Sequence, residues 1–179
     1  MSSFKEMMLA RHSCRSYTDR PVEKGLIMQC IEAARLAPSA CNSQPWSFVA
    51  VTKAETRAQL SELLQVIGGN KFSHNVPVMI AVCEDAEPKV MPAVKETYGA
   101  KFFAQGDLGA AAMAITIQAQ ELGLSTCIMG TFDDTKVKAL LNIPSDMTVR
   151  VVIALGYSED NAIRPKNRKE IADIIRFIE

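Results

Sequence analysis

Residues 76–83 are apolar at every position, and this run constrains the fold more than any other stretch of the chain. A strand with one solvated face alternates apolar and polar side chains, and this run shows no such alternation. Its length suits a strand, and both faces of such a strand have to be covered. We therefore expect a central strand in a sheet that carries helices on both sides.

The remaining apolar patterns predict further elements on both sides of this run. Strands are expected at residues 47–52 and 147–155, and a short strand or an extended turn at 125–132. Helices are expected at residues 4–10, 21–37 and 107–122. Two further helices are expected with caps, one at 52–66 with a capping box of Thr52 and Glu55, and one that Asp133 caps and that ends at residue 141. The polar stretch 84–99 is expected to be a variable lid, or a short helix flanked by loops.

These elements follow one another without a regular βαβ alternation. The chain contains neither a G-x-G-x-x-G motif after a strand nor a P-loop. An α+β fold, with helices packed around one sheet, is therefore favoured over a doubly wound nucleotide-binding fold.

Length and composition predict one soluble domain over residues 1–179. The formal net charge of +0 argues against a nucleic-acid or membrane partner held by bulk electrostatics. Five cysteines without a C-x-x-C motif suit a reducing cytoplasm, and two histidines without H-E-x-x-H make a metal site unexpected. The N-terminus lacks a signal-peptide core, and no apolar run is long enough to span a membrane.

Residues 37–46, A-P-S-A-C-N-S-Q-P-W, spend two prolines, an Asn, a Gln and the single tryptophan of the chain on one connection. Small hydroxyl and amide groups between two prolines make a stiff loop that presents neutral hydrogen-bonding groups. Such groups suit a polyol or the edge of a heterocycle better than a metal ion.

Cationic and amide candidates lie outside this loop. Residues 11–17, R-H-S-C-R-S-Y, are either an anion site, since Arg forks and Ser hydroxyls match phosphate oxygens, or the solvated end of a helix. Asn70, after two glycines, is either a left-handed residue that ends a helix or a ligand contact.

The sequence resembles the nitroreductase family of FMN-dependent oxidoreductases. Residues 11–17 are similar to the family's R-x-S-x-[RK]-x-[FY], residues 37–46 to its A-P-S-x-x-N-x-Q-P-W, and R-P-K-N-R-K at 164–169 to its C-terminal K-x-R. Residues 107–111 and 122–126 look like parts of the family's central helix. The resemblance implies a nitroreductase-like α+β fold, with a central, mostly antiparallel sheet flanked by helices, and an intertwined homodimer that binds FMN at the subunit interface.

Site residues follow from the matching positions. The resemblance implies that the FMN phosphate is held by Arg11, Ser13, Lys166 and Arg168, with His12 beside them. It places Arg15 at the N1 and O2 edge of the flavin, where negative charge collects after hydride uptake. It assigns contacts with the ring and ribityl chain to Pro38, Ser39 and Asn42 of the partner subunit and to Asn70, and it turns the backbone of Ile128, Met129 and Gly130 toward flavin N5 and O4.

The activity implied is hydride transfer from NAD(P)H through flavin N5 to a small organic oxidant such as a nitroaromatic or a quinone. No side-chain nucleophile or general base is needed, because the cofactor carries the chemistry. Other flavin reactions on the same fold remain open, namely reductive dehalogenation, dehydrogenation or flavin breakdown, as do a flavin-binding protein without turnover and a structural dimer with a decayed site.

Two features depart from the family pattern. Cys41 stands where the family often has Gly or Ala, and it is either a tolerated small side chain or a redox group. The short stretch between Cys83 and Asp107 leaves little room for the helical insertion that covers the pocket in larger members, so a more open pocket or a different lid is expected.

Overall fold

The computed structural model describes residues 3–160 and 164–179, so Met1 and Ser2 of the N-terminal segment lie outside the described residues. Its centre is a four-stranded sheet with strand order β1-β2-β4-β3. Every pair of neighbouring strands in this sheet is antiparallel. The strands are β1 (Trp46–Val51), β2 (Val78–Glu84), β3 (Ser125–Met129) and β4 (Thr148–Gly156).

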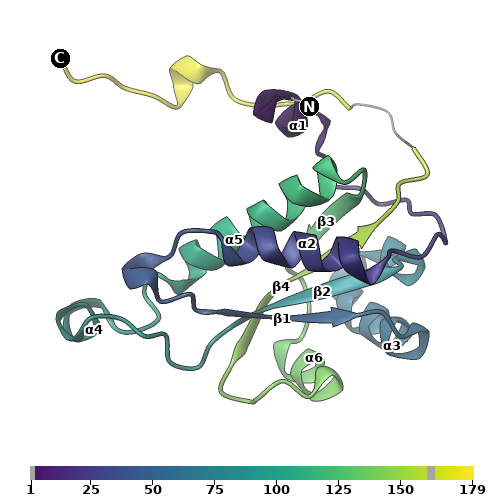
Figure 1. The fold of residues 1–179 in the computed structure, drawn as a ribbon, viewed down its shortest axis with the longest axis horizontal. Coiled ribbons are helices and arrows are strands. Elements are labelled where there is room, and N and C mark those ends of the chain that lie inside the picture. The colour runs from purple at the N-terminus through teal and green to yellow at the C-terminus, as the bar shows by residue number, and fades with distance from the viewer. Residues whose placement is uncertain (1–2, 161–163) are drawn as a thin grey trace.

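Helices cover both faces of the sheet (Figure 1). They are α1 (Phe4–Ala10), α2 (Lys24–Arg35), α3 (Ala54–Leu64), α4 (Pro92–Tyr98), α5 (Ala104–Glu121) and α6 (Asp134–Leu141). Helices α2 and α5 lie together over one face, and α3 and α6 lie below the other. The α+β arrangement expected from the order of the elements is confirmed.

Strand β2 is buried at every position and lies between β1 and β4, which confirms the expected central strand. Its side chains alternate between the two faces. Val78, Ile80 and Val82 pack in the core under α2 and α5. Met79 and Cys83 pack on the opposite face with α3 and α6. One continuous apolar run therefore supplies both cores.

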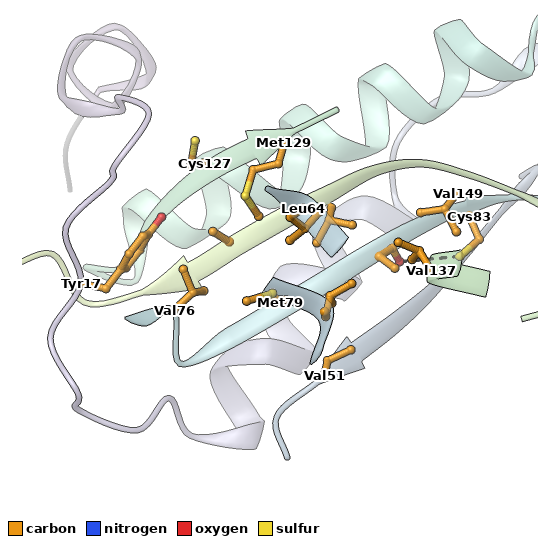
Figure 2. Close-up of a cluster of buried hydrophobic side chains, with 14 of the residues drawn as sticks. Tyr17, Val51, Leu64, Val76, Met79, Cys83, Cys127, Met129, Val137 and Val149 are labelled. Carbon is orange, nitrogen blue, oxygen red and sulfur yellow. Dashed lines mark hydrogen bonds between the residues drawn. The ribbon is translucent and has the colours of Figure 1, made fainter. Parts of the chain in front are cut away.

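Figure 2 shows the core on the α3 and α6 face, which extends from Tyr17 at one end to Val149 at the other. The Tyr17 hydroxyl donates a hydrogen bond to the Cys14 carbonyl over 3.1 Å, and burial raises the pKa of this phenol. This bond lies within the segment between α1 and α2, and the bridge between Ser13 and Thr126 joins that segment to β3.

The start of α3 differs from the expectation. The N-cap residue is Lys53 and makes no side-chain capping bond, so the predicted capping box of Thr52 and Glu55 is wrong. The Thr52 carbonyl instead accepts a hydrogen bond from Arg57 Nε over 3.1 Å. By contrast, the Asp133 carboxylate accepts from the Lys136 N–H, and this predicted cap of α6 is confirmed.

The stretch predicted as a lid or short helix contains α4, a short helix flanked by loops (Figure 1). Helix α5 begins at Ala104, earlier than the predicted start at Asp107. The C-terminal segment has one 3-10 turn, Ile171–Asp173, and its apolar residues remain exposed. Across the described ranges, the helices are too short or too polar to cross a bilayer.

Candidate functional site

The segment after α1 runs along the outer side of β3. Ser13 forms a parallel bridge with Thr126, and the Cys14 N–H donates to the Thr126 carbonyl over 2.9 Å. This pairing places Arg11 and Arg15 near buried Cys127. Burial raises the pKa of the Cys127 thiol, while the positive charges of Arg15 and Arg11 act to lower it. Both guanidiniums therefore lie at this edge of the sheet.

The C-terminal basic motif returns to the same place. Lys166 Nζ donates a hydrogen bond to the Arg11 carbonyl. The pKa of Lys166 is lowered by partial burial and by the charges of Arg11 and Arg168. Three cations from the two ends of the chain therefore gather beside β3. His12 is next to them, with Nδ1 3.2 Å from the Ala10 carbonyl.

The cation cluster is defined as Arg11, Lys166 and Arg168. Within residues 3–160 and 164–179, no carboxylate forms an ion pair with any of its members or with Arg15. Like charges that lower the pKa of a neighbouring lysine favour a bound anion. Together with the exposed Ser13 hydroxyl, the donors of the cluster fit a phosphate dianion.

The loop predicted to contact FMN, which we call the flavin loop and define as residues 38–46, has an unusual backbone. Cys41, Asn42 and Gln44 adopt positive φ angles of 55°, 50° and 46°. Hydrogen bonds within the loop support this shape. Ser39 Oγ accepts from the Gln44 N–H over 2.9 Å, and Gln44 Nε2 donates to Asn42 Oδ1 over 3.2 Å. Pro38 is exposed at its start, so polar groups and a proline are presented to solvent as expected.

A side chain from α5 also holds this loop. The Ala40 N–H donates to the Asp107 carboxylate, with Oδ1 at 3.1 Å and Oδ2 at 3.2 Å. The sequence pattern predicts Asp107 only as the start of a helix. An acidic residue in the first turn of a helix is also typical of simple dipole compensation, so only the contact with Ala40 distinguishes its role.

The flavin loop and the cation cluster lie at opposite ends of α5. Asp107 holds the loop near the start of α5, whereas Thr126, beside Ser13, follows the end of this helix. With a rise of 1.5 Å per residue, the helix between Asp107 and Glu121 is about 21 Å long. The structure therefore does not bring Pro38, Ser39 and Asn42 together with the cations within one subunit.

Three other predicted residues lie on β3 or directly after it. Ile128 is 44% exposed on β3, whereas the Met129 side chain is 2% exposed and packs in the core. Only the backbone of Met129 is thus free to face a ligand. A side chain built at Gly130 would meet nothing within 4 Å, so the backbone there is open to a close approach.

The structure bears on one of the two interpretations of Asn70 that the sequence leaves open. It adopts the left-handed conformation, with φ at 52°. Its Nδ2 donates to the carbonyl of Leu64, the last residue of α3, over 3.0 Å. The left-handed conformation is confirmed, but α3 ends at Leu64 with Gln65 as its C-cap, so Asn70 contributes to this helix end only through its side chain. The ligand contact stays a prediction.

Glu84 is a buried charge that the sequence pattern hides, because it follows an apolar run as an ordinary strand end. Its side chain is 0% exposed, and Oε2 accepts from Arg150 Nε over 2.6 Å. Lys101 Nζ, in the segment before α5, is 3.7 Å from Oε1. Glu84 pairs with Trp46 across the sheet, so these charges lie beside the end of the flavin loop.

One cavity lies apart from the predicted site. It has a volume of about 570 Å³, and its lining includes Tyr17, Arg57, His74 and Glu159 but none of the predicted cofactor contacts. Arg57 there is engaged with the Val76 carbonyl over 2.6 Å. Among the described residues, no group of three or more His, Cys, Asp or Glu side chains forms a metal site.

Comparison with known proteins agrees with the fold and the motifs. Residues 8–67 and 66–157 match the family model described as the Nitroreductase family. The chain therefore belongs to the nitroreductase family.

Individual relatives extend this finding. A protein of Archaeoglobus fulgidus whose name includes NAD(P)H nitroreductase is 33% identical over 164 residues, which cover 89% of this chain and 88% of that protein. The structure of a nitroreductase family protein of Streptococcus pneumoniae TIGR4 has a TM-score of 0.80 at 26% identity, covering 98% of this chain and 100% of that one. An FMN-dependent nitroreductase of Clostridium difficile R20291 has a TM-score of 0.75 at 28% identity, covering 97% and 98%.

Proposed function

We propose that this protein is an FMN-dependent oxidoreductase that transfers hydride from NAD(P)H through flavin N5 to a small organic oxidant such as a nitroaromatic or a quinone. The observation that carries the proposal is the gathering of Arg11, Lys166 and Arg168, with no paired carboxylate in the part of the chain that the structure describes, in a member of the nitroreductase family. When bound, FMN supplies the redox chemistry. The side chains of the protein bind and orient it.

The roles of the residues follow from their chemistry and position. Arg11, Lys166 and Arg168, together with the Ser13 hydroxyl, hold the phosphate, and His12 lies beside them. Arg15 supports the N1 and O2 edge of the ring. This role is supported by its exposure and by its position two residues beyond Ser13, whose carbonyl accepts from Arg15 Nη1 over 3.3 Å.

Ring and ribityl contacts complete the proposed site. The backbone of Ile128, Met129 and Gly130 faces N5 and O4, and Asn70 contacts the ring and ribityl chain. Pro38, Ser39 and Asn42 act from the second subunit. The separation of the flavin loop and the cation cluster along α5 supports this division, since a short ribityl chain joins phosphate and ring.

The proposal requires an intertwined homodimer, in which residues 1–179 of each chain form one FMN-binding domain. Apolar side chains remain exposed on α1 and α2, among them Phe4 at 65%, Met28 at 57% and Leu36 at 69%. Two open grooves of about 370 and 290 Å³ run beside α5 on the same side, and Ala33 lines both. A second copy would cover this surface.

We also propose that the protein works in the cytoplasm, without a nucleic-acid or membrane partner. The five cysteines are free, and four of them are buried in the cores rather than paired. A balanced net charge supports the absence of bulk electrostatic partners.

The visible spectrum of the purified protein, followed by anaerobic titration with NADH and NADPH, tests the function. We expect a yellow protein whose flavin is reduced by at least one of the two donors and is reoxidised by a nitroaromatic or a quinone. A colourless protein that takes up no FMN would overturn the proposal. A yellow protein that neither donor reduces would favour flavin binding without turnover.

Two arginine variants test the assigned roles. Arg15→Ala is expected to slow flavin reduction more than it weakens FMN binding, because a cation at the N1 edge acts on charge that develops during reduction. Arg168→Ala is expected to do the opposite, because it removes a phosphate contact. Stopped-flow reduction and FMN titration measure the two effects. Loss of FMN alone in both variants would show that Arg15 does not support the ring edge.

A further inference from the structure

The flavin loop is held in a conformation that its own residues disfavour. Cys41, Asn42 and Gln44 all lie in the left-handed region, where a side chain crowds the backbone and where, of these three, only Asn is common. Such a backbone persists only where the surrounding structure fixes it. The contacts that hold the loop therefore determine which groups it presents.

The loop is fixed to the rest of the subunit at two points. At its end, the Asp85 N–H donates to the Pro45 carbonyl over 3.1 Å. Near its beginning, the Ala40 N–H donates to the Asp107 carboxylate. The three left-handed residues lie between these two points. Among the described contacts, Asp107 is the long-range anchor made by a side chain.

The chemistry of Asp107 suits this role. Both carboxylate oxygens lie within 3.2 Å of one N–H, so the hydrogen bond is charge-assisted and tolerates small shifts of the carboxylate. Asp107 is in the first turn of α5, where the helix dipole favours a negative charge. The orientation of Ala40 in turn sets the directions of Ser39 before it and of Asn42 after it.

We propose that Asp107 is a positioning residue for cofactor binding, which holds the flavin loop in the shape that presents Ser39 and Asn42 to FMN. The inference rests on the proposed function, because it assumes that this loop contacts FMN. Asp107 itself does not touch the cofactor. Its loss releases the strained loop and weakens the contacts made by its neighbours.

The test compares Asp107→Ala and Asp107→Asn with Glu121→Ala, a control at the exposed end of the same helix whose carboxylate accepts from Gln118. Hydrogen exchange of cofactor-free protein, followed by mass spectrometry of peptides that cover residues 37–46, reports on the anchor. FMN titration by flavin fluorescence reports on binding. Asn keeps one acceptor oxygen and the shape of the side chain, so this variant is informative even if Ala impairs folding.

For Asp107→Ala we expect exchange in residues 37–46 to become at least about tenfold faster and the FMN dissociation constant to rise about tenfold, the size of one lost charged hydrogen bond. Asp107→Asn is expected to fall between Ala and the wild type, and Glu121→Ala to match the wild type in both measurements. A residue that only stabilised α5 would change the melting temperature of the protein and leave loop exchange and FMN affinity unchanged.

Unchanged exchange in Asp107→Ala overturns the anchor. Faster exchange with unchanged FMN affinity overturns the positioning role while wild-type binding keeps the proposed function. Failure of the wild type to bind FMN overturns the proposed function instead, and the exchange comparison separates that result from a failed anchor.

Discussion

Lys166 is the residue whose surroundings most clearly call for an anion. Burial and two neighbouring guanidiniums lower the pKa of its ammonium group. A phosphate dianion in the same place would offset both effects. The cost of gathering these cations is thus borne by the cofactor-free protein and is relieved when FMN binds.

The lowered pKa predicts opposite pH dependences for binding and stability. As the pH rises through the lowered pKa of Lys166, this residue loses its charge, so FMN affinity is expected to fall in a pH window below the ordinary lysine pKa of 10.5. In that window the unfolded chain binds more protons than the folded one, so this residue makes the cofactor-free protein more stable as pH rises.

FMN titration across this pH range measures the effect, with Lys166→Met as the matched variant. The variant is expected to bind FMN more weakly at pH 7 and to show a flatter pH profile. An equal decline of affinity with pH in both proteins would place the titrating group elsewhere.

At the scale of single residues, the motifs predict which cations meet, and the structure brings Arg11, Lys166 and Arg168 together as expected. This gathering could be predicted because a motif specifies residue types and their charges. The sequence pattern did not predict the contacts of Asp107 and Glu84, because each of these residues contacts a backbone or side chain that is far away in the sequence. Their spacing from those partners carries no local signal.

Among the elements, strand β4 ends at Gly156, where glycine is required because there is no room for a side chain and not because of its backbone conformation. A Cβ at Gly156 would lie 2.5 Å from Pro77 Cγ and 3.0 Å from Tyr17 Cδ1. The proline ring is rigid, and Tyr17 is held by its hydrogen bond to Cys14. Strands β2 and β4 therefore come together here only around a residue without a side chain.

Gly156→Ala is expected to destabilise the protein by about 1–3 kcal/mol, the usual cost of overpacking. Gly25→Ala in α2 is the control, since a Cβ there meets nothing within 4 Å and removal of a helical glycine stabilises by about 0.5–1 kcal/mol. Urea unfolding at one protein concentration measures both. A neutral Gly156→Ala would mean that Pro77 shifts freely.

The pattern of the elements was predicted better than their ends. Period and length reveal β2, β4 and α6, because a buried face repeats along the whole element. The starts of α3 and α5 were misplaced, and the groups expected to cap them make other contacts. Arg57 takes the Thr52 carbonyl, and the Asp107 carboxylate serves Ala40 rather than the end of its own helix.

For the whole molecule, the exposed apolar surface beside α1, α2 and α5 is the feature that matters most for the proposed function. It carries exposed Phe4, Met28 and Leu36 and the two grooves that share Ala33. The family resemblance predicts a dimer. The flavin loop and the cations of one subunit lie at opposite ends of α5, so we expect a second subunit to complete each site.

Ala33→Glu is expected to convert the dimer into a monomer and to weaken FMN binding, because a carboxylate would have to be buried without a partner. Ala139→Glu, at an exposed position of α6, is the control. Light scattering gives the mass, far-UV circular dichroism checks the fold, and FMN titration gives affinity. A dimeric Ala33→Glu protein with normal FMN affinity would place the subunit contact elsewhere.

The hydrogen bond between Lys166 and the Arg11 carbonyl joins positions 155 residues apart and has a consequence for biosynthesis. The ribosome makes the Arg11 segment first and Lys166 and Arg168 only after the last strand of the sheet. A translation product that stops before residue 166 can therefore contain every strand and still lack two of the cations proposed to hold the phosphate. From the proposed site we therefore expect FMN to bind only after residue 168 has been made, and an interrupted chain to bind FMN weakly.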